Sequence, residues 1–402
     1  MSKSKKFRDV IFNLHRYLGL VVGLIAIIAG LTGSLLVFMR DIDNFAFAHK
    51  YGAVIPQGVH GVSLQKNRLP LSVLVDRVKA AHVNEPDFQI GGIFPYGLYF
   101  DSTPKPDVPA IIGDFLVDPY TGKLLAQNPS WFGSEFFGKV YEIHTALLIG
   151  DAGAYILGIA AALMVILSVT GIVLWPGWRK LSSGFKIKLD ARAKRLNFDI
   201  HKVVGIILGV VLLLPVGTGA WWDFPLFGST LEIIFMPVDA VASIFTPQTP
   251  QTVDSLATAS TPTPSQKPFP LDVIVQKAQA ALPNFSIFSI GVPSKSQAGT
   301  YDFRMISPRT QSWDSEVHID QYTGEILQVV DGTKITSLLG RLSNYSTPLH
   351  YGVFGGLSTK ILYVFVGISP AILLVTGLNM FRLRHKRVSR KNPVDLSNES
   401  QS

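Results

Sequence analysis

The segment HRYLGLVVG at residues 15–23 is repeated as HKVVGIILG at residues 201–209. Both copies read His-x3-Gly-x3-Gly, with a basic residue directly after the histidine. A Thr-Gly pair follows seventeen residues after each histidine, at residues 32–33 and 218–219. Because these matches share one offset within two apolar stretches, they indicate an internal duplication rather than chance.

The composition is that of a membrane protein. The chain has 402 residues, of which 48% are hydrophobic and only 16% charged, a balance unlike that of soluble domains. The net charge of +8 is clustered beside the apolar stretches, so we attribute it to membrane topology rather than to nucleic-acid binding. The chain has no cysteine, which excludes disulfides, c-type haem attachment and thiolate-bound iron–sulfur or zinc sites. Haem held by imidazole remains possible.

Four apolar stretches alternate with two long polar regions. Lys and Arg gather before the first stretch, between the second and third, and after the fourth, so the positive-inside rule places those segments in the cytoplasm. Both polar regions are then extracytoplasmic. We predict, in chain order, a cytoplasmic tail (1–10), transmembrane helix 1 (11–39), a first extracytoplasmic domain (40–138), helix 2 (139–176), a cytoplasmic loop (177–201), helix 3 (202–222), a second domain (223–347, with a flexible insertion at 248–268), helix 4 (348–381) and a cytoplasmic tail (382–402).

The two polar regions carry matching signals of an α+β domain. The segments LSVLVDRVKAA (71–81) and LDVIVQKAQAA (271–281) both have helical periodicity. A turn signature, Asp-x-x-Thr-Gly, recurs at 118–122 and 320–324 between apolar runs, and predicts a β-hairpin in each domain. The carboxylates of these turns also suggest calcium binding, but the hairpin is the favoured interpretation. Strand-like runs precede the first turn at residues 89–94 and 111–117.

The histidines form a fourfold pattern. His15 and His201 begin the first and third apolar stretches, whereas His144 and His350 precede the second and fourth. A Thr-Gly pair begins 26 residues after each of the latter two, which would span roughly 39 Å in a continuous helix and place both histidines at the outer rim of the bilayer. Two pairs of histidines, one per membrane face, suit the axial positions of two b-type haems, since neutral imidazole is a good iron ligand. We therefore predict that His15 pairs with His201 and that His144 pairs with His350.

Small and basic residues beside the first pair fit the same interpretation. A glycine one and two turns after the histidine leaves a flat groove for a macrocycle edge, and the basic neighbour suits a haem propionate. The alternative is that the small residues serve helix packing, and that each histidine is only an interfacial residue. The candidate residues are Gly19, Gly23, Gly205, Gly209, Arg16 and Lys202.

Other sites are not indicated. The chain lacks a nucleotide-binding glycine loop, a Walker lysine motif, a nucleophile elbow and a HExxH zinc motif. If the protein transfers electrons, it would thus receive them from a membrane quinol or a separate cytoplasmic reductase. The remaining histidines recur at no shared offset and are expected to be surface or structural residues; they are His49, His60, His82, His318 and His385.

These motifs together resemble the PepSY-associated transmembrane family of bacterial inner-membrane proteins. The resemblance runs over about residues 8–384 and rests on the two His-x3-Gly segments, the two Asp-x-x-Thr-Gly turns with their preceding helices, His144-Thr145 and His350. It implies a membrane α plus α/β fold, with four transmembrane helices in two tandem repeats that flank two periplasmic PepSY-like α+β domains. Similar members include di-haem ferrisiderophore reductases of the FoxB type. The resemblance implies two haem b groups per chain and the reduction of a ferric siderophore in the periplasm.

Three hypotheses follow. The first is a haem-dependent ferric-chelate reductase, because hard oxygen ligands hold iron(III) far better than iron(II), and reduction therefore releases the metal. The second is a membrane-anchored PepSY protein that binds a peptide or peptidase and has no redox activity. The third, a permease, is disfavoured because Asp151 is the one evident carboxylate in a span. Candidate contacts to a chelate are Tyr120, Tyr322, Trp313 and Arg304.

Overall fold

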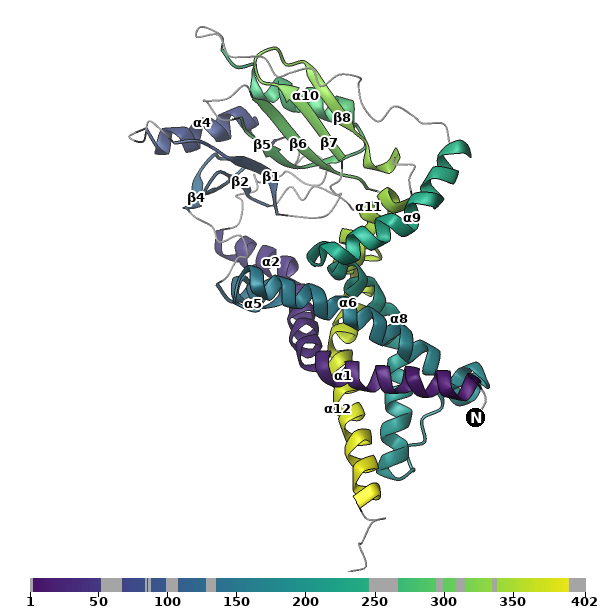
Figure 1. Ribbon diagram of the computed structural model, residues 1–402. Helices are drawn as coiled ribbons and strands as arrows, with labels where there is room; N and C mark the ends of the chain where they lie inside the picture. Colours follow the sequence, from purple (N-terminus) through teal and green to yellow (C-terminus); the bar gives the residue numbers. More distant parts are fainter. Residues whose placement is uncertain are drawn as a thin grey trace, which may run out of the picture. The chain divides into compact units, whose positions relative to one another are not determined.

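The computed structural model describes residues 3–51, 67–83, 85, 88–98, 108–127, 135–245, 267–293, 299–308, 315–334 and 338–389 (Figure 1). The chain divides into two compact units. The predicted insertion at 248–268 falls almost entirely outside the described residues, as does Trp313. We call Met1–Val37, Val140–Ser229 and Gly355–Ser402 the membrane unit, and Phe38–Lys139 and Thr230–Phe354 the sheet unit.

Four long helices build the membrane unit. They are α1 (Lys3–Leu36), α6 (Asp151–Leu174), α8 (Ala193–Asp223) and α12 (Gly356–Ser389). Each contains a stretch that is long and apolar enough to cross a bilayer. Helix α1 packs against α6 and α12, and α8 packs against the same two helices, so the four form a closed bundle (Figure 1). The predicted four spans are confirmed, and the chain is a multi-pass membrane protein.

The centre of this bundle is aliphatic. Buried side chains from all four helices meet there. Small residues bring α1 and α12 together, since a Cβ atom on Gly30 would overlap the carbonyl oxygen of Gly367, and the Ser34 hydroxyl donates to the carbonyl of Val364 at 3.0 Å. Such backbone approach is typical of helix packing in membranes. The central side chains are Val22, Ala26, Met164, Leu212 and Val366.

The predicted helix at 139–176 is in fact two helices. Helix α5 (Glu135–Ala146) ends just after His144, and α6 begins at Asp151. Leu147 and Leu148 between them have φ values of 50° and 63°, and Gly150 has 60°, a left-handed conformation that breaks the helix and is unfavourable for leucine. The prediction that a continuous helix holds His144 roughly 39 Å from Thr170 was therefore wrong.

The predicted helix at 348–381 is interrupted in the same way. Helix α11 (Leu338–Tyr351) ends before Gly352, whose φ is 68°, and α12 starts at Gly356, whose φ is 63°. Helix α8 begins nine residues before the predicted start at 202. Three further helices were not expected from the sequence: α2 (Met39–Tyr51), α7 (Leu181–Phe185) and α9 (Pro225–Phe245). The same holds for the 3₁₀ turns η1 (Pro176–Trp178) and η2 (Gly332–Lys334).

The sheet unit holds an antiparallel sheet that has eight strands in the described residues. Helices α4 (Leu71–Ala81) and α10 (Leu271–Ala281) have the predicted bounds, and their apolar sides contribute to the hydrophobic core on the sheet. The strand order is β4-β3-β2-β1-β5-β6-β7-β8. The strands are β1 (Gly92–Leu98), β2 (Ala110–Ile112), β3 (Phe115–Val117), β4 (Leu124–Gln127), β5 (Ser286–Gly291), β6 (Thr300–Ile306), β7 (Ser315–Asp320) and β8 (Ile326–Val330).

The two halves of this unit share one sheet and one core. Strand β1 pairs with β5, and Ile93 lies opposite Ile290; both side chains are fully buried. The helices meet as well, because the Asp272 carboxylate accepts a hydrogen bond from the Ser72 backbone N–H at 3.2 Å and another from its hydroxyl. An acidic group at that position stabilises the N-terminus of α4.

The predicted hairpins are confirmed. Strands β3 and β4 pair across the first turn, and β7 and β8 across the second. In each turn one carboxylate oxygen accepts two backbone N–H bonds, at 2.8 and 3.2 Å for Asp118 and at 2.8 and 2.9 Å for Asp320. The single strand predicted at 111–117 is instead two strands, because Gly113 turns the chain with a φ of 58°.

Candidate functional site

His15 and His201 face each other across the membrane unit. Their ring centroids lie 6.3 Å apart, and the ring planes are at 89°. An imidazole nitrogen binds a metal ion at about 2 Å, and the ring centre lies about 1 Å beyond that nitrogen. Two imidazoles on opposite sides of one metal ion therefore have centres about 6 Å apart, which is the separation observed here.

The Nδ1 atom of His15 lies against helix α6. It is 3.1 Å from the carbonyl oxygen of Leu167 and 3.0 Å from Oγ1 of Thr170. A carbonyl can only accept, so Nδ1 carries the proton and Nε2 keeps its lone pair. This is the tautomer in which a histidine binds metal through Nε2.

His144 repeats this arrangement at the other end of α1. Its Nδ1 atom is 3.0 Å from the carbonyl oxygen of Ala29 and 3.1 Å from Oγ1 of Thr32. Because Thr32 lies seventeen residues after His15 on one helix, the two rings are separated by roughly 26 Å along α1. The break after α5 thus lets His144 lie against α1 of the bundle.

His201 follows the same rule on the remaining pair of helices. Its Nδ1 atom is 2.9 Å from Oγ1 of Thr376 on α12. Each ring also lies against the glycine that follows its threonine: a Cβ atom on Gly171 would be 3.1 Å from Cε1 of His15, and one on Gly377 would be 3.7 Å from Cε1 of His201. At Gly33 the corresponding distance to Cε1 of His144 is 3.1 Å.

The Thr-Gly pairs therefore contact and orient the rings of these three histidines. This role was not predicted from the sequence. The recurrence of these pairs after each of the four histidines of the repeat pattern was the available signal, but the pair that supports a given ring lies on another helix. His350 is in α11 beside Tyr351, with ring centroids 5.8 Å apart. Its pairing with His144 stays a prediction from the sequence repeat.

A family model described as the PepSY-associated TM region matches residues 12–384. The chain belongs to this family. No curated protein matches the chain at a significant level. The predicted membership of the PepSY-associated family is confirmed, whereas the haem-containing reductase subtype stays a prediction.

The glycines of this PepSY-associated protein differ in their surroundings. A Cβ atom on Gly209 would meet nothing within 4 Å, and those on Gly19 and Gly205 would make ordinary contacts of 3.7 Å with Leu167 and Leu373. A Cβ atom would therefore fit at these three positions, and their role beside a haem stays a prediction. Gly23 instead packs against Leu374, which a Cβ would approach to 2.6 Å, so helix packing explains this glycine.

The two basic neighbours also differ. Arg16 donates from Nη2 to the Tyr17 hydroxyl at 2.7 Å, while its Nε is buried and has no hydrogen-bond partner within the described residues. Lys202 is buried and bonds Asp199 at 2.6 Å and the carbonyl of Ser183 at 3.0 Å. Arg16 therefore retains a donor for an acidic ligand group, whereas the ammonium of Lys202 has other partners and does not fit the predicted role.

Two of the predicted chelate contacts have other partners or surroundings in the sheet unit, and Trp313 lies outside the described residues. Tyr120 is buried in its turn, and Arg304 is 3.7 Å from Glu316. His318 lies between two carboxylates, with Nδ1 2.7 Å from Asp302, and this hydrogen bond raises the pKa of the imidazole. Over the described part of the chain, no group of three or more His, Asp or Glu side chains is arranged to hold a metal ion directly.

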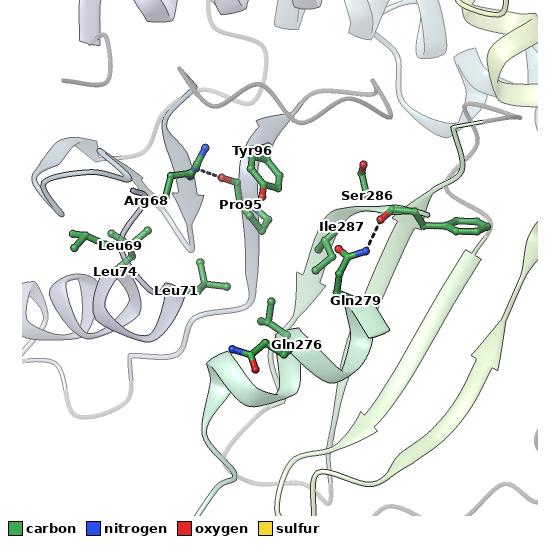
Figure 2. Close-up of a pocket in the computed structure, with 12 residues that line it drawn as sticks. Arg68, Leu69, Leu71, Leu74, Pro95, Tyr96, Gln276, Gln279, Ser286 and Ile287 are labelled. Carbon is green, nitrogen blue, oxygen red and sulfur yellow. Dashed lines mark hydrogen bonds between the residues drawn. The ribbon is translucent and has the colours of Figure 1, made fainter. Parts of the chain in front are cut away.

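The sheet unit contains a cavity of about 560 Å³ (Figure 2). Residues of both halves line it, and no carboxylate side chain is among them. Arg68 donates to the carbonyl of Pro95 at 2.5 Å, and its guanidinium lies 4.7 Å from the centre of the Tyr96 ring. On the other side, Gln279 donates to the carbonyl of Phe285 at 2.8 Å (Figure 2). A cationic group with aliphatic neighbours suits a small ligand that carries negative charge.

Proposed function

We propose that this PepSY-associated membrane protein is a di-haem oxidoreductase of the bacterial inner membrane, with both termini in the cytoplasm. It would pass electrons from a quinol or a cytoplasmic reductase to an iron(III) chelate in the periplasm. The separation of 6.3 Å between the rings of His15 and His201 carries the haem part of this proposal. The composition is compatible with it, since a chain without cysteine cannot hold a redox metal centre by thiolate ligands, whereas imidazole ligands are available.

In this proposal, four histidines and Arg16 would hold the two haems. His15 and His201 offer their Nε2 atoms to one iron, and Arg16 offers its unpaired Nε to a propionate. His144 offers its Nε2 to a second iron, with His350 as the partner assigned from the sequence repeat alone. Bound at these histidines, b-type haems would supply one-electron transfer at both ends of the bundle. The aliphatic core between the two ends excludes water.

The cavity in the sheet unit is our candidate for chelate binding. Its lining contains Arg68 and no carboxylate, which favours an anionic iron(III) chelate over a cationic one. Ferric citrate is a suitable probe in equilibrium dialysis with the purified protein. The Arg68→Gln variant should bind it more weakly, whereas Arg77→Gln, which changes an exposed arginine on the neighbouring helix α4, should bind it as the wild type does.

The test of the haem proposal is an absorption spectrum of the purified protein, oxidised and then reduced with dithionite, with haem counted per chain. We expect two b-type haems with low-spin bands, and loss of one haem in each of the variants His15→Ala and His144→Ala. A colourless protein, produced with ample haem supply, would contradict the proposal. The leading hypothesis would then be a membrane-anchored PepSY protein that binds a peptide or peptidase.

A further inference from the structure

The threonine hydroxyls beside the histidines have a fixed direction of hydrogen bonding. Oγ1 of Thr170 donates to the carbonyl of Leu167 at 2.8 Å, and that of Thr32 donates to Ile28 at 2.7 Å. Oγ1 of Thr376 donates to Ile372 at 2.7 Å. A hydroxyl has a single proton, so in each case the oxygen is left to accept from the Nδ1–H of the histidine.

We propose that Thr376, Thr170 and Thr32 are positioning residues that tune the reduction potential of the haem their histidine ligates. This inference rests on the proposed function. Thr376 and Thr170 would act on the haem of His201 and His15, and Thr32 would act on the haem of His144. The assignment follows from the three Oγ1–Nδ1 distances of 2.9, 3.0 and 3.1 Å.

The physical reason is the effect of an acceptor at Nδ1. A hydrogen bond from Nδ1–H pushes electron density into the imidazole ring and makes Nε2 a more basic ligand. A more basic ligand stabilises iron(III) relative to iron(II), so the haem has a lower reduction potential. The bond also fixes the rotation of the ring, and with it the plane that each imidazole presents to the iron.

Each threonine should affect the reduction potential of only one haem, because the threonines of the two haems lie at different ends of the bundle. Thr32 and Thr376 lie on different helices, α1 and α12, and each contacts a histidine of a different predicted pair. A change at one threonine should therefore alter one haem and leave the other as it was. A general loosening of the bundle would instead shift both.

The test is a potentiometric titration of the purified haem-loaded protein, followed by absorption spectroscopy. In Thr376→Val the haem of His15 and His201 should show a higher midpoint potential, while the second haem is unchanged. Thr32→Val should raise the potential of the second haem alone, and by less, because the carbonyl of Ala29 still accepts from the Nδ1–H of His144. Thr376→Ser keeps a hydroxyl and should restore the wild-type value. Thr359→Val is the control, because Thr359 lies on the same helix as Thr376, and its hydroxyl accepts from the N–H of Gly355 and donates to the carbonyl of Gly356 at the start of that helix.

If Thr376→Val does not fold or load haem, Thr170→Val tests the same haem from its other ligand. It should shift the potential in the same direction but by less, because the carbonyl of Leu167 still accepts from the Nδ1–H of His15. The proposal is overturned if the valine variants leave both potentials unchanged, lower them, or shift both haems together. It is also overturned if Thr376→Ser shifts the potential as far as Thr376→Val does. A wild-type protein without haem would refute the proposed function instead, so the two failures are distinguishable.

Discussion

Gly171 and Gly377 occupy equivalent positions after their threonines, but they leave different amounts of room for a side chain. A Cβ atom on Gly171 would lie 3.1 Å from Cε1 of His15, whereas one on Gly377 would lie 3.7 Å from Cε1 of His201. Two non-bonded carbon atoms in favourable contact are about 3.5–4.0 Å apart. Alanine at 171 therefore displaces the His15 ring by several tenths of an ångström, and alanine at 377 fits.

The expected size of this effect follows from packing. Adding a methyl group to a filled site costs about 1–3 kcal/mol, which corresponds to roughly 5- to 150-fold weaker binding of the haem that His15 ligates. Replacing glycine by alanine within a helix also gains about 1 kcal/mol of helix propensity. Since both variants share that gain, the difference between them isolates the contact with the ring.

The assay is the rate at which each purified variant loses haem to excess apomyoglobin. Gly171→Ala should lose one of its two haems faster than the wild type, while Gly377→Ala should retain both. Gly33→Ala, where the distance to Cε1 of His144 is again 3.1 Å, should lose the other haem. Equal loss from Gly171→Ala and Gly377→Ala would refute the argument that the glycines make room for the ligand rings.

Three further predictions concern stability. The hydrogen bond with Asp302 raises the pKa of His318 above its usual 6.5, so the pair stabilises the folded protein below about pH 6.5 and loses this contribution as the pH rises through the higher folded-state value. Near pH 6, the thermal midpoint of Asp302→Asn should thus lie below that of the wild type, by the equivalent of less than about 1 kcal/mol, since the pair is partly exposed. The two midpoints should converge at higher pH. A difference that stays constant with pH would contradict this account. Asp199→Asn leaves the buried ammonium of Lys202 without its carboxylate and should lower the free energy of unfolding, measured in detergent, by about 3–5 kcal/mol. An unchanged unfolding midpoint would show that the pair is dispensable. Asp118→Ala removes the acceptor of two backbone N–H bonds, one of them buried, and should lower the unfolding free energy by about 2 kcal/mol. The loss should be smaller in Asp118→Asn, which keeps an acceptor oxygen.

Much of the fold could be predicted because its signals are local. Hydropathy and charge suffice for the four spans, and helical periodicity gave α4 and α10 their bounds. The Asp-x-x-Thr-Gly turns predicted both hairpins, since the aspartate satisfies the turn's own N–H groups. The helix breaks before α6 and α12 were not predicted, for different reasons. The glycines at 352 and 356 are a recognisable signal of a helix end. The two consecutive leucines at 147 and 148 adopt a left-handed conformation that follows from packing and not from residue preference.

The missed features depend on contacts between distant segments. The pairing of Ile93 with Ile290 joins strands almost 200 residues apart, and no local pattern specifies it. The sequence predicted His15, His201 and His144 as ligands, but it did not predict that Thr-Gly pairs on neighbouring helices support them. The partner of Lys202 was not predicted, because Asp199, three residues before it on the same helix, falls in the segment 177–201 that was predicted to be a cytoplasmic loop.

The most direct test of the central claim is electron paramagnetic resonance of the oxidised protein at low temperature. His15 and His201 present ring planes at 89°. Two perpendicular imidazoles interact with different iron d orbitals and leave them nearly equal in energy, which gives a low-spin iron(III) signal of very large anisotropy. We predict such a signal in the wild type and its loss in both His15→Ala and His201→Ala. A wild-type spectrum without this highly anisotropic signal, or the same signal undiminished in both variants, would contradict the claim that these two histidines ligate one haem.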